Sequence, residues 1–506
     1  MRLSVKDILF CLLSALLLTL SFSSFNLEFL AWVGFIPFFF ALQGKSKGKA
    51  FLFSYITGII FWSCTIYWLI HVTLLGLILL VLYLALYFGL FGFIFSTSEL
   101  RTSTSELLFI PATWVLLEYL RGHLLTGFPW ALLGYSQYQN PPVIQIADIT
   151  GAWGVSFLVI MINIAVYSLF VNRYSLFVKI KNIFITILIL LVAVSYGFYK
   201  LRRTPNSELR TPIKISVIQP NIAQELKWDP GARNYILDKY FQLSKKAAQD
   251  APDLIIWPEA AVPGILGEDA SVFKKAFSLT KEIEIPLLIG GVVFEKGNYF
   301  NSALLIDENK LMKRYDKLHL VPFGEYIPLK KILPFLETVV PIGDITAGKE
   351  YTVFTHELRT SNFERPVYFS VLICFEDLFP ELSREFVRRG AHFLINITND
   401  AWYKETPASY QHLQASVFRA VENRVFLVRS ANTGISGFIK PTGAVLSLVK
   451  DQTGRKIFVE GFNTQNIYLY PKRLTFYTRN GDVFILPLLI FIIYSIFRLI
   501  KPKYRM

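Results

Sequence analysis

The chain has 506 residues, of which 53% are hydrophobic and only 17% are charged. Because an ordinary soluble domain is about 25% charged, this composition argues against a wholly soluble protein and indicates segments within a bilayer. The formal net charge is +14, but much of the basic charge lies in short runs beside apolar segments. That placement indicates membrane topology and contact with anionic headgroups, and we expect no nucleic-acid partner.

Eight apolar runs predict membrane-spanning helices, since a bilayer core of about 30 Å requires about 20 mostly apolar residues. The runs lie near residues 7–23, 27–43, 50–71, 73–97, 106–120, 154–171, 181–199 and 482–499. We therefore expect a seven-helix membrane domain over residues 1–200, an eighth helix at 482–499 and a basic tail at 500–506. A cleaved signal peptide is the alternative for the first run, but the short SSFN turn after it favours a helical hairpin.

Basic residues beside these runs predict the orientation, because cytoplasmic loops are enriched in lysine and arginine. They precede the first run and follow the second and sixth runs, at Arg2, Lys6, Lys45, Lys47, Lys49, Arg173, Lys179 and Lys181. With the basic tail, they predict cytoplasmic termini and place residues 211–472 on the outer side. The KLRRT sequence at the end of the seventh run departs from this rule.

The loop from Arg121 to Trp153 is aromatic and rich in glycine and proline, and long loops of this kind are often functional. Glu118 and Arg121 are spaced to pair on one helix face, either for function or to fix this loop. We expect Trp130 and Trp153 either in an interfacial aromatic belt or along a groove for lipid access.

Residues 211–472 alternate between β-rich runs and helical stretches, as α/β domains do. The expected strands are Lys214–Gln219, Asp253–Trp257, Leu287–Val293, Val367–Cys374 and His392–Ile397. The expected helices include Tyr235–Ala248 and Gln414–Glu422. We therefore predict an extramembrane α/β domain whose strands are covered on at least one face.

Ionisable residues stand at or near the ends of these strands, where α/β sheets place their sites. Glu259 follows DLIIWP, Lys317 lies in RYDKLHLVPFGEYIP and Cys374 ends VYFSVLIC. A carboxylate can take the proton of a thiol. An ammonium can stabilise both the thiolate and the oxyanion of a tetrahedral intermediate, with the N–H after the cysteine as a second donor. The three residues therefore predict thiol acyl transfer without metal or histidine.

The remaining cysteines and histidines carry little chemical signal. The three cysteines are too widely spaced for a disulfide framework or a zinc site, and Cys11 and Cys64 lie in apolar runs, where cysteine usually packs. The six histidines lack metal-binding spacing, so we expect no metal and no cofactor. Taken singly, a strand-end cysteine also most often packs, and Arg424 and Arg429 either bind phosphate or are structural.

Longer motifs around these residues resemble the nitrilase (carbon–nitrogen hydrolase) superfamily and, more specifically, its membrane member, the apolipoprotein N-acyltransferase family. The motifs are QPNIAQELKWDP at 219–230, WPEAAVP at 257–263, YDKLHLVPFGEYIP at 315–328, ICFED at 373–377, NITNDAWY at 396–403 and RAVENR at 419–424. In the membrane half, LLEYLRG at 116–122 and TGFPWALLGYSQ at 126–137 match as well. The resemblance implies an αββα sandwich between the seventh and eighth of eight transmembrane helices.

Carried over position by position, the resemblance implies Glu259 as general base, Lys317 as the oxyanion lysine and Cys374 as nucleophile. It also implies Glu325 and Glu376 as supporting acids near the thiol.

Four further positions follow from the same motifs. Trp228 would lie in a mobile lipid-contacting arm, and Trp402 is a second implied substrate contact. Phe375 stands where the family often has tyrosine, so the hydroxyl is lost but the backbone N–H remains. Lys404 stands where the family often has glycine, which affects the conformation expected for that loop.

The resemblance also implies the reaction. A fatty acyl group would pass from a membrane phospholipid, through a cysteine thioester, to the N-terminal amine of diacylglyceryl-cysteine on an apolipoprotein, as the last step of lipoprotein maturation. The protein would be a multi-pass protein of the bacterial inner membrane with its catalytic domain on the periplasmic side. The alternatives are a membrane-tethered amidase, a non-catalytic lipid- or lipoprotein-binding protein and a transporter.

Overall fold

The computed structural model describes residues 5–22, 25, 27–96, 105–171, 174–203, 212–327, 345–356, 366–469 and 473–500. The chain divides into two compact units. The helical unit joins residues 1–204 to residues 480–506, and the α/β unit comprises residues 205–479. Arg2, Arg173 and the tail at 501–506, whose charges help to orient the chain, lie outside the described residues.

Each apolar run of the sequence contains helix. The longer helices of the helical unit are α1 (Val5–Ser21), α2 (Ile36–Leu42), α3 (Lys47–Thr65), α4 (Leu74–Ser96), α5 (Glu106–His123), α8 (Ala152–Phe170), α9 (Leu176–Arg203) and α16 (Ile485–Ile500). Among the described residues, three helices are long and apolar enough to cross a membrane, namely α4, α8 and α9. Shorter apolar helices span Glu28–Leu42 and Asp482–Phe497.

Helices α3 and α4 approach each other closely at small residues. A Cβ atom at Gly92 would overlap Ser54, and one at Gly58 would press on Phe88. Such small residues let helix backbones pack by van der Waals contact, which is the main attraction between helices in lipid. Cys11 is buried in this unit, but Cys64 on α3 is exposed. Both cysteines were expected to pack, and within this unit only Cys11 does so.

The two tryptophans of the loop between α5 and α8 are buried within the helical unit. Trp130 and Trp153 are each 1% exposed. Trp153 Nε1 donates a hydrogen bond to Asp482 Oδ1 at 2.6 Å, which ties α8 to the end of the chain. Neither an interfacial belt nor a groove lining fits side chains this deeply buried, so both expectations are wrong.

The charged residues at the end of α5 hold the same loop through its main chain. Arg121 Nη1 donates to the carbonyl oxygens of Phe128 and Trp130, at 2.7 and 2.8 Å. Glu118 Oε1 accepts from the main-chain N–H of Leu133 at 2.7 Å. This agrees with the interpretation that the pair fixes the loop.

The α/β unit contains two sheets. The first is seven-stranded, with the order β13-β1-β2-β4-β5-β6 and β3 beside β4. Its strands are β1 (Pro212–Gln219), β2 (Leu254–Ile256), β3 (Ile265–Leu266), β4 (Leu287–Glu295), β5 (Asn298–Asp307), β6 (Lys310–Asp316) and β13 (Gly461–Tyr468). Because β2 is parallel to β4, and β4, β5 and β6 are successively antiparallel, β2 and β6 end at the same edge.

The second sheet is six-stranded, with the order β12-β11-β10-β9-β8-β7. Its strands are β7 (Phe354–His356), β8 (Val367–Ile373), β9 (Phe393–Thr398), β10 (Phe426–Ala431), β11 (Gly437–Ile439) and β12 (Val445–Leu448). The three central strands, β8, β9 and β10, are parallel. Strands of this kind are buried on both faces, which explains why most of their residues are apolar.

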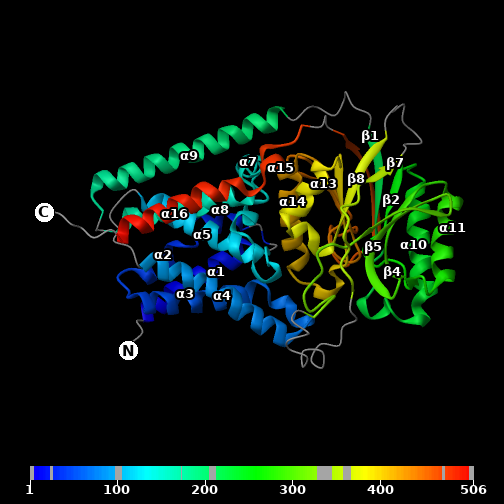
Figure 1. Cartoon of the computed structure of the whole chain (residues 1–506), viewed down its shortest axis with the longest axis horizontal. Coiled ribbons are helices and arrows are strands. Elements are labelled where there is room, and N and C mark those ends of the chain that lie inside the picture. Colours follow the sequence, from blue (N-terminus) through cyan, green and yellow to red (C-terminus); the bar gives the residue numbers. More distant parts are fainter. Residues whose placement is uncertain are drawn as a thin grey trace. The chain divides into compact units, whose positions relative to one another are not determined.

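The sheets pack face to face and helices cover their outer faces (Figure 1). Helices α10 (Arg233–Ala248) and α11 (Ala270–Ile283) lie on the first sheet, and α13 (Pro380–Arg388) and α14 (Ala408–Asn423) on the second. Between the sheets, Ser430 Oγ of β10 donates to the carbonyl oxygens of Ile218 and Ile256, at 3.0 and 3.1 Å. The predicted αββα sandwich is confirmed.

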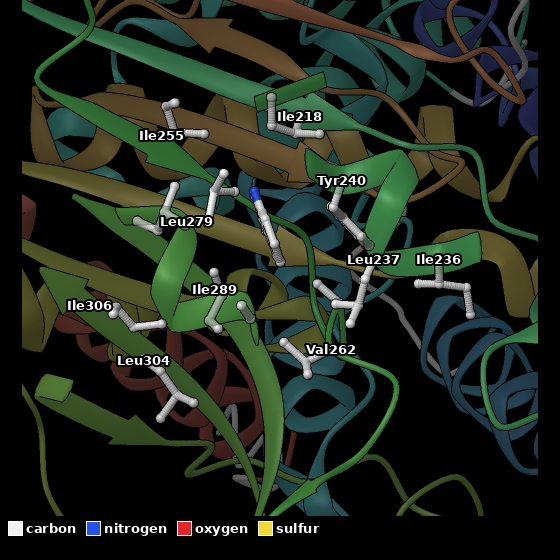
Figure 2. Packing of buried hydrophobic residues seen from close by; sticks show 14 of the residues in the cluster. Ile218, Ile236, Leu237, Tyr240, Ile255, Val262, Leu279, Ile289, Leu304 and Ile306 are labelled. Atoms are coloured by element: carbon white, nitrogen blue, oxygen red, sulfur yellow. The ribbon is translucent and has the colours of Figure 1, made fainter. Parts of the chain in front are cut away.

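The core between the first sheet and its helices fixes the end of β2 (Figure 2). Tyr240 of α10 stacks on Trp257, with ring centroids 4.5 Å apart. The indole Nε1 of Trp257 donates to Ser244 Oγ at 2.9 Å. A Cβ atom at Gly290 would collide with the carbonyl of Pro258, so this glycine lets the turn after β2 lie against β4. These contacts set the position of Glu259.

Candidate active site

Three strand ends bring Glu259, Lys317 and Cys374 together. Glu259 follows β2, Lys317 follows β6 at the same edge, and Cys374 follows β8 of the second sheet. Lys317 Nζ lies 3.6 Å from Glu259 Oε1, and the charges of both residues act on the Cys374 thiol. All three side chains are buried. The residues that stand at separate strand ends in the sequence therefore form one buried cluster.

Both carboxylate oxygens of Glu259 accept hydrogen bonds. Asn301 Nδ2 on β5 donates to Oε1 at 2.8 Å, and the main-chain N–H of Asn399 donates to Oε2 at 3.0 Å. Asn301 Nδ2 also donates to Glu325 Oε1 at 2.8 Å, which links the two acids. These bonds orient the carboxylate toward a fixed position, as proton transfer requires. Sequence reasoning missed Asn301, because an amide within a strand gives no chemical signal by itself.

Lys317 is shared between two carboxylates. Its Nζ lies 2.8 Å from Glu325 Oε2, closer than to Glu259. Although burial disfavours the ammonium, the Glu325 and Glu259 carboxylates raise the pKa of Lys317 above its ordinary value. The main-chain N–H of Val321 donates to Glu325 Oε2 at 2.8 Å and holds this acid in place. Lys317 is therefore charged, and Glu325 acts on the lysine.

Cys374 lies at a strained turn between β8 and the short helix η9 (Cys374–Leu378). Its φ is +53°, in the left-handed region that non-glycine residues adopt at a cost of about 1–3 kcal/mol and chiefly at functional sites. Burial and the Glu259 carboxylate raise the pKa of the Cys374 thiol, and Lys317 opposes them. The thiol is therefore protonated at rest, and its attack requires a base.

Glu376 joins the loop that carries Lys317 to the turn that carries Cys374. Its carboxylate accepts hydrogen bonds from Tyr315 Oη (2.8 Å), Leu318 N (2.7 Å), His319 N (3.1 Å) and Ile373 N (2.7 Å). Burial raises the pKa of Glu376 to about 7 against these donors. Glu376 is thus bonded to the two backbone segments and holds them together, and its supporting role near the thiol stays a prediction.

A buried charged network lies behind the nucleophile. His412 of α14 binds Asp377 through Nε2 at 2.8 Å and Asp400 through Nδ1 at 3.1 Å. Arg429 Nη1 of β10 lies 2.9 Å from Asp377 Oδ2. Of the two roles expected for Arg429, phosphate binding and a structural role, this buried ion pair supports the structural one. Although burial lowers it, the two aspartates raise the pKa of His412 to about 9. Sequence reasoning missed His412, whose partners lie in other elements.

Two more buried polar residues border the cluster. Lys227 Nζ donates to the main-chain oxygen of Glu259 at 3.0 Å, and burial lowers the pKa of Lys227 to about 8. Burial is the main cause that raises the pKa of the Tyr403 hydroxyl, and the charge of Cys374 is the next largest. Both groups lie in the quoted motifs, yet their spacing gave no indication that they reach the site.

The aromatic residues singled out in the sequence have different surroundings. Phe375 is buried, and its ring packs on Phe379 with centroids 5.2 Å apart. Trp228 and Trp402 are 51% and 48% exposed. Each is adjacent in sequence to a buried residue at the site, Lys227 for the first and Tyr403 for the second. Both rings are thus half exposed, although the chain beside each of them is buried at the cluster.

Lys404 ends η10 (Asp400–Tyr403) in a backbone conformation that favours glycine. Its φ and ψ are 52° and −163°. The loop thus keeps a glycine-like conformation although the residue is lysine.

An αββα sandwich with a buried carboxylate, ammonium and thiol at its strand ends defines a thiol enzyme of the carbon–nitrogen hydrolase class. The profile described as carbon-nitrogen hydrolase matches residues 214–471. The profile described as the apolipoprotein N-acyltransferase N-terminal domain matches residues 14–165. The chain belongs to the apolipoprotein N-acyltransferase family.

Relatives of that name match along most of their length. The apolipoprotein N-acyltransferase of Geobacter metallireducens is 39% identical over 500 residues, 95% of this chain and 92% of the relative. That of Chlorobaculum tepidum is 29% identical over 512 residues, 95% and 94% of the two chains. Among solved structures, an amidase of the nitrilase superfamily from Nesterenkonia matches 56% of this chain and 98% of its own, with 17% identity and a TM-score of 0.40.

Proposed function

We propose that this chain transfers a fatty acyl group from a membrane phospholipid, through a thioester on Cys374, to the N-terminal amine of a diacylglyceryl-cysteine on an apolipoprotein. The buried convergence of Glu259, Lys317 and Cys374 carries the proposal. The acceptor and the carbon–nitrogen bond formed are those named by the family. The donor is an ester because a thiol attack on an ester leaves a thioester reactive enough for an amine.

In the first half-reaction, the sulfur of Cys374 attacks the ester carbonyl while Glu259 takes the thiol proton. The carbon–sulfur bond forms, and the oxyanion of the tetrahedral intermediate is stabilised by Lys317 and by the main-chain N–H of Phe375. The intermediate then breaks its carbon–oxygen bond. The leaving lysophospholipid oxygen receives the proton from Glu259, so charge and protons balance and a thioester remains.

In the second half-reaction, the free amine of the acceptor attacks the thioester carbonyl. Glu259 takes a proton from the nitrogen, the carbon–nitrogen bond forms and the same two donors stabilise the oxyanion. The carbon–sulfur bond breaks, and the Cys374 sulfur regains the proton from Glu259. Kinetics are therefore ping-pong, with lysophospholipid released before the acceptor reacts.

The substrates determine where the site works. Acyl chains are nearly insoluble in water, so the site opens at the surface of the bacterial inner membrane. Residues 1–200 contribute seven transmembrane helices and residues 482–499 an eighth, followed by the cytoplasmic tail at 500–506. The catalytic domain at 211–472 lies on the periplasmic side and both termini are cytoplasmic, which is supported by the lysine- and arginine-rich ends of the apolar runs.

Trp228 and Trp402 contact the lipid substrates. Both indoles are about half exposed next to buried residues of the site. Tryptophan favours the membrane–water interface, where its ring is partly apolar and its N–H remains hydrated. Two half-exposed rings of this kind would guide acyl chains from the bilayer toward Cys374.

The acyl-enzyme tests this function directly. After incubation with phospholipid and no acceptor, intact-protein mass spectrometry should find one acyl group per chain, released by hydroxylamine at neutral pH as a thioester is. Cys374→Ala should carry no adduct, whereas Cys11→Ser and Cys64→Ser should carry a normal one. A stoichiometric adduct on another residue, or full transfer by Cys374→Ala, would contradict the proposal.

A further inference from the structure

Two side chains hold the carbonyl oxygen of Cys374 from the side of the second sheet. Asn396 Nδ2, on β9, donates to this oxygen at 3.1 Å and to the carbonyl of Leu372 at 3.2 Å. His412 Nε2, on α14, lies 3.2 Å from the same Cys374 oxygen. Both side chains are buried. The carbonyl is therefore directed toward β9 and α14.

The charge state of His412 makes Nε2 a donor, whose single N–H is shared between Asp377 Oδ1 at 2.8 Å and the Cys374 oxygen at 3.2 Å. Its two ring nitrogens face two carboxylates, Asp400 at Nδ1 and Asp377 at Nε2. Carboxylates accept hydrogen bonds, so both nitrogens carry protons and the ring is an imidazolium. Arg429 lies against the same aspartates, and Ser416 donates to Asp377. The positive charges of His412 and Arg429 balance the negative charges of the two aspartates, which lets the charged imidazole ring remain buried.

The direction of the carbonyl determines the direction of the next N–H. The Cys374–Phe375 peptide bond is trans, and a planar trans peptide points its C=O and N–H in opposite directions. With the oxygen toward β9 and α14, the Phe375 N–H points toward the first sheet. Glu259 and Lys317 come from that sheet, so the N–H is aimed at the side from which the reacting carbonyl must be held.

We propose that Asn396 and His412 are positioning residues that aim the Phe375 N–H at the oxyanion by holding the Cys374 carbonyl from behind. The inference rests on the acyl-transfer function proposed above. A rotation of this peptide plane would exchange the directions of C=O and N–H with little movement of the chain, so the N–H keeps its direction only if contacts of the peptide oppose that rotation. The hydrogen bonds from Asn396 and His412 to the Cys374 oxygen, here called the clamp, oppose the rotation. Hydrogen bonding to the oxygen also polarises the N–H of the same peptide.

The test compares two reactions of the same thiol. Acylation by an ester passes through an oxyanion, whereas alkylation by iodoacetamide does not. Asn396→Leu keeps the number and branching of the side-chain heavy atoms but removes the donor, and we expect acylation to slow by about 10²-fold, near the loss of one oxyanion donor. Alkylation should change less than about 3-fold, because general-base activation of the thiol is retained.

A matched pair at His412 separates positioning from folding. The amide nitrogen of glutamine lies near the place of Nε2, and that of asparagine near Nδ1. His412→Gln should therefore retain acylation within about 10-fold of wild type, while His412→Asn should lose about as much as Asn396→Leu, on the scale of one oxyanion donor. Asn423→Leu is the control. Asn423 is also buried on α14, but its amide donates to Ser383 Oγ and to the carbonyl oxygen of Arg419.

The outcomes are distinct. Parallel loss of acylation and alkylation in Asn396→Leu and His412→Asn, or equal losses in the two His412 variants, would overturn the clamp and indicate a role in stability alone. The acyl donors are phospholipid vesicles and, separately, a water-soluble p-nitrophenyl ester. Wild type that reacts with the p-nitrophenyl ester but not with phospholipid would refute the proposed donor and still test the clamp.

Discussion

At the scale of single residues, Lys317 and its two carboxylates divide the work of the site. Glu325 lies closer to the ammonium than Glu259 does, at 2.8 against 3.6 Å. Glu325 therefore carries most of the pairing with the lysine charge. Glu259 remains oriented by two neutral donors, Asn301 and the Asn399 N–H, and this leaves it available to accept the thiol proton.

Replacing Glu259 and Lys317 in separate variants should show what each residue contributes to acyl transfer. Glu259→Gln keeps the shape but cannot accept a proton, and we expect acyl transfer to fall by about 10²–10⁴-fold. Lys317→Met removes the ammonium at the oxyanion and should lower the rate by about 10²–10³-fold. Lys239 lies on α10 and pairs with Glu460; Lys239→Met, which breaks this ion pair, is the control and should retain the rate. Near-normal turnover of either site variant would remove its assigned role.

The imidazolium of His412 predicts a pH dependence of stability. Its pKa is raised from 6.5 to about 9, so the folded state binds this proton more tightly than the unfolded state. The stabilisation is complete below pH 6.5 and is lost as pH rises through about 9, a change of about 3 kcal/mol. Thermal unfolding in detergent at pH 6 and pH 9.5 should show the advantage of wild type over His412→Gln shrinking by this order. A constant difference would exclude the charged ring.

The convergence of the three residues proposed as catalytic was predictable from sequence because each has a distinctive chemical type at a strand end. Their partners were not. Asn301, Asn396 and His412 act through contacts between separate elements, and amides or histidines at such positions are common in any folded domain. Glu376 shows the same limit. The family resemblance implied a supporting acid near the thiol, but the backbone N–H groups that its carboxylate binds could not be read from the sequence.

At the scale of elements, buried strands were easier to predict than exposed ones. The runs that became β1, β4, β8 and β9 are largely apolar because both faces are covered. β6 carries lysine and arginine along a largely exposed strand, so its hydrophobic pattern is weak. The short β11 and β12 offer too few residues for any period. β6 lies at one edge of the first sheet, and β11 and β12 lie at one side of the second.

The loop after β9 offers a test of strain at a single element. Lys404 adopts φ 52° and ψ −163°, which glycine adopts at far lower energy. Lys404→Gly should therefore raise the free energy of unfolding by about 1 kcal/mol, after the added entropy of the unfolded chain is subtracted. The measurement is the thermal midpoint of the full chain in detergent. Lys450→Gly, at an exposed loop lysine with ordinary φ, should not be stabilising, and equal shifts in both variants would contradict the strain.

At the scale of the whole molecule, the apolar runs located the helices well because length and hydropathy are strong signals. The burial of the Trp130 and Trp153 side chains could not be predicted from length and hydropathy. An aromatic residue near a helix end suits an interfacial belt, and burial depends on which distant segment covers it. Asp482 provides that cover for Trp153, from the far end of the sequence.

The proposed orientation can be tested by reporter fusions. Ser46 precedes α3 beside three lysines, and we expect a cytoplasmic reporter there to be active. Ser207 lies outside the described residues, between α9 and β1, and a periplasmic reporter should be active at that position. Alkaline phosphatase and a fluorescent protein, each fused at both sites, give four readings. Both sites reporting the same side of the membrane would rule out the eight-helix topology.

The helical unit is discontinuous in sequence, which has a consequence for synthesis. Trp153 and Asp482 are separated by 329 residues, and α16 packs on α5 within the same unit. At about 5–20 residues per second, translation of the intervening chain takes on the order of tens of seconds. For that time the earlier helices form an unfinished bundle. The nascent chain must therefore keep the uncovered face of α5 compatible with lipid until the last helix leaves the ribosome.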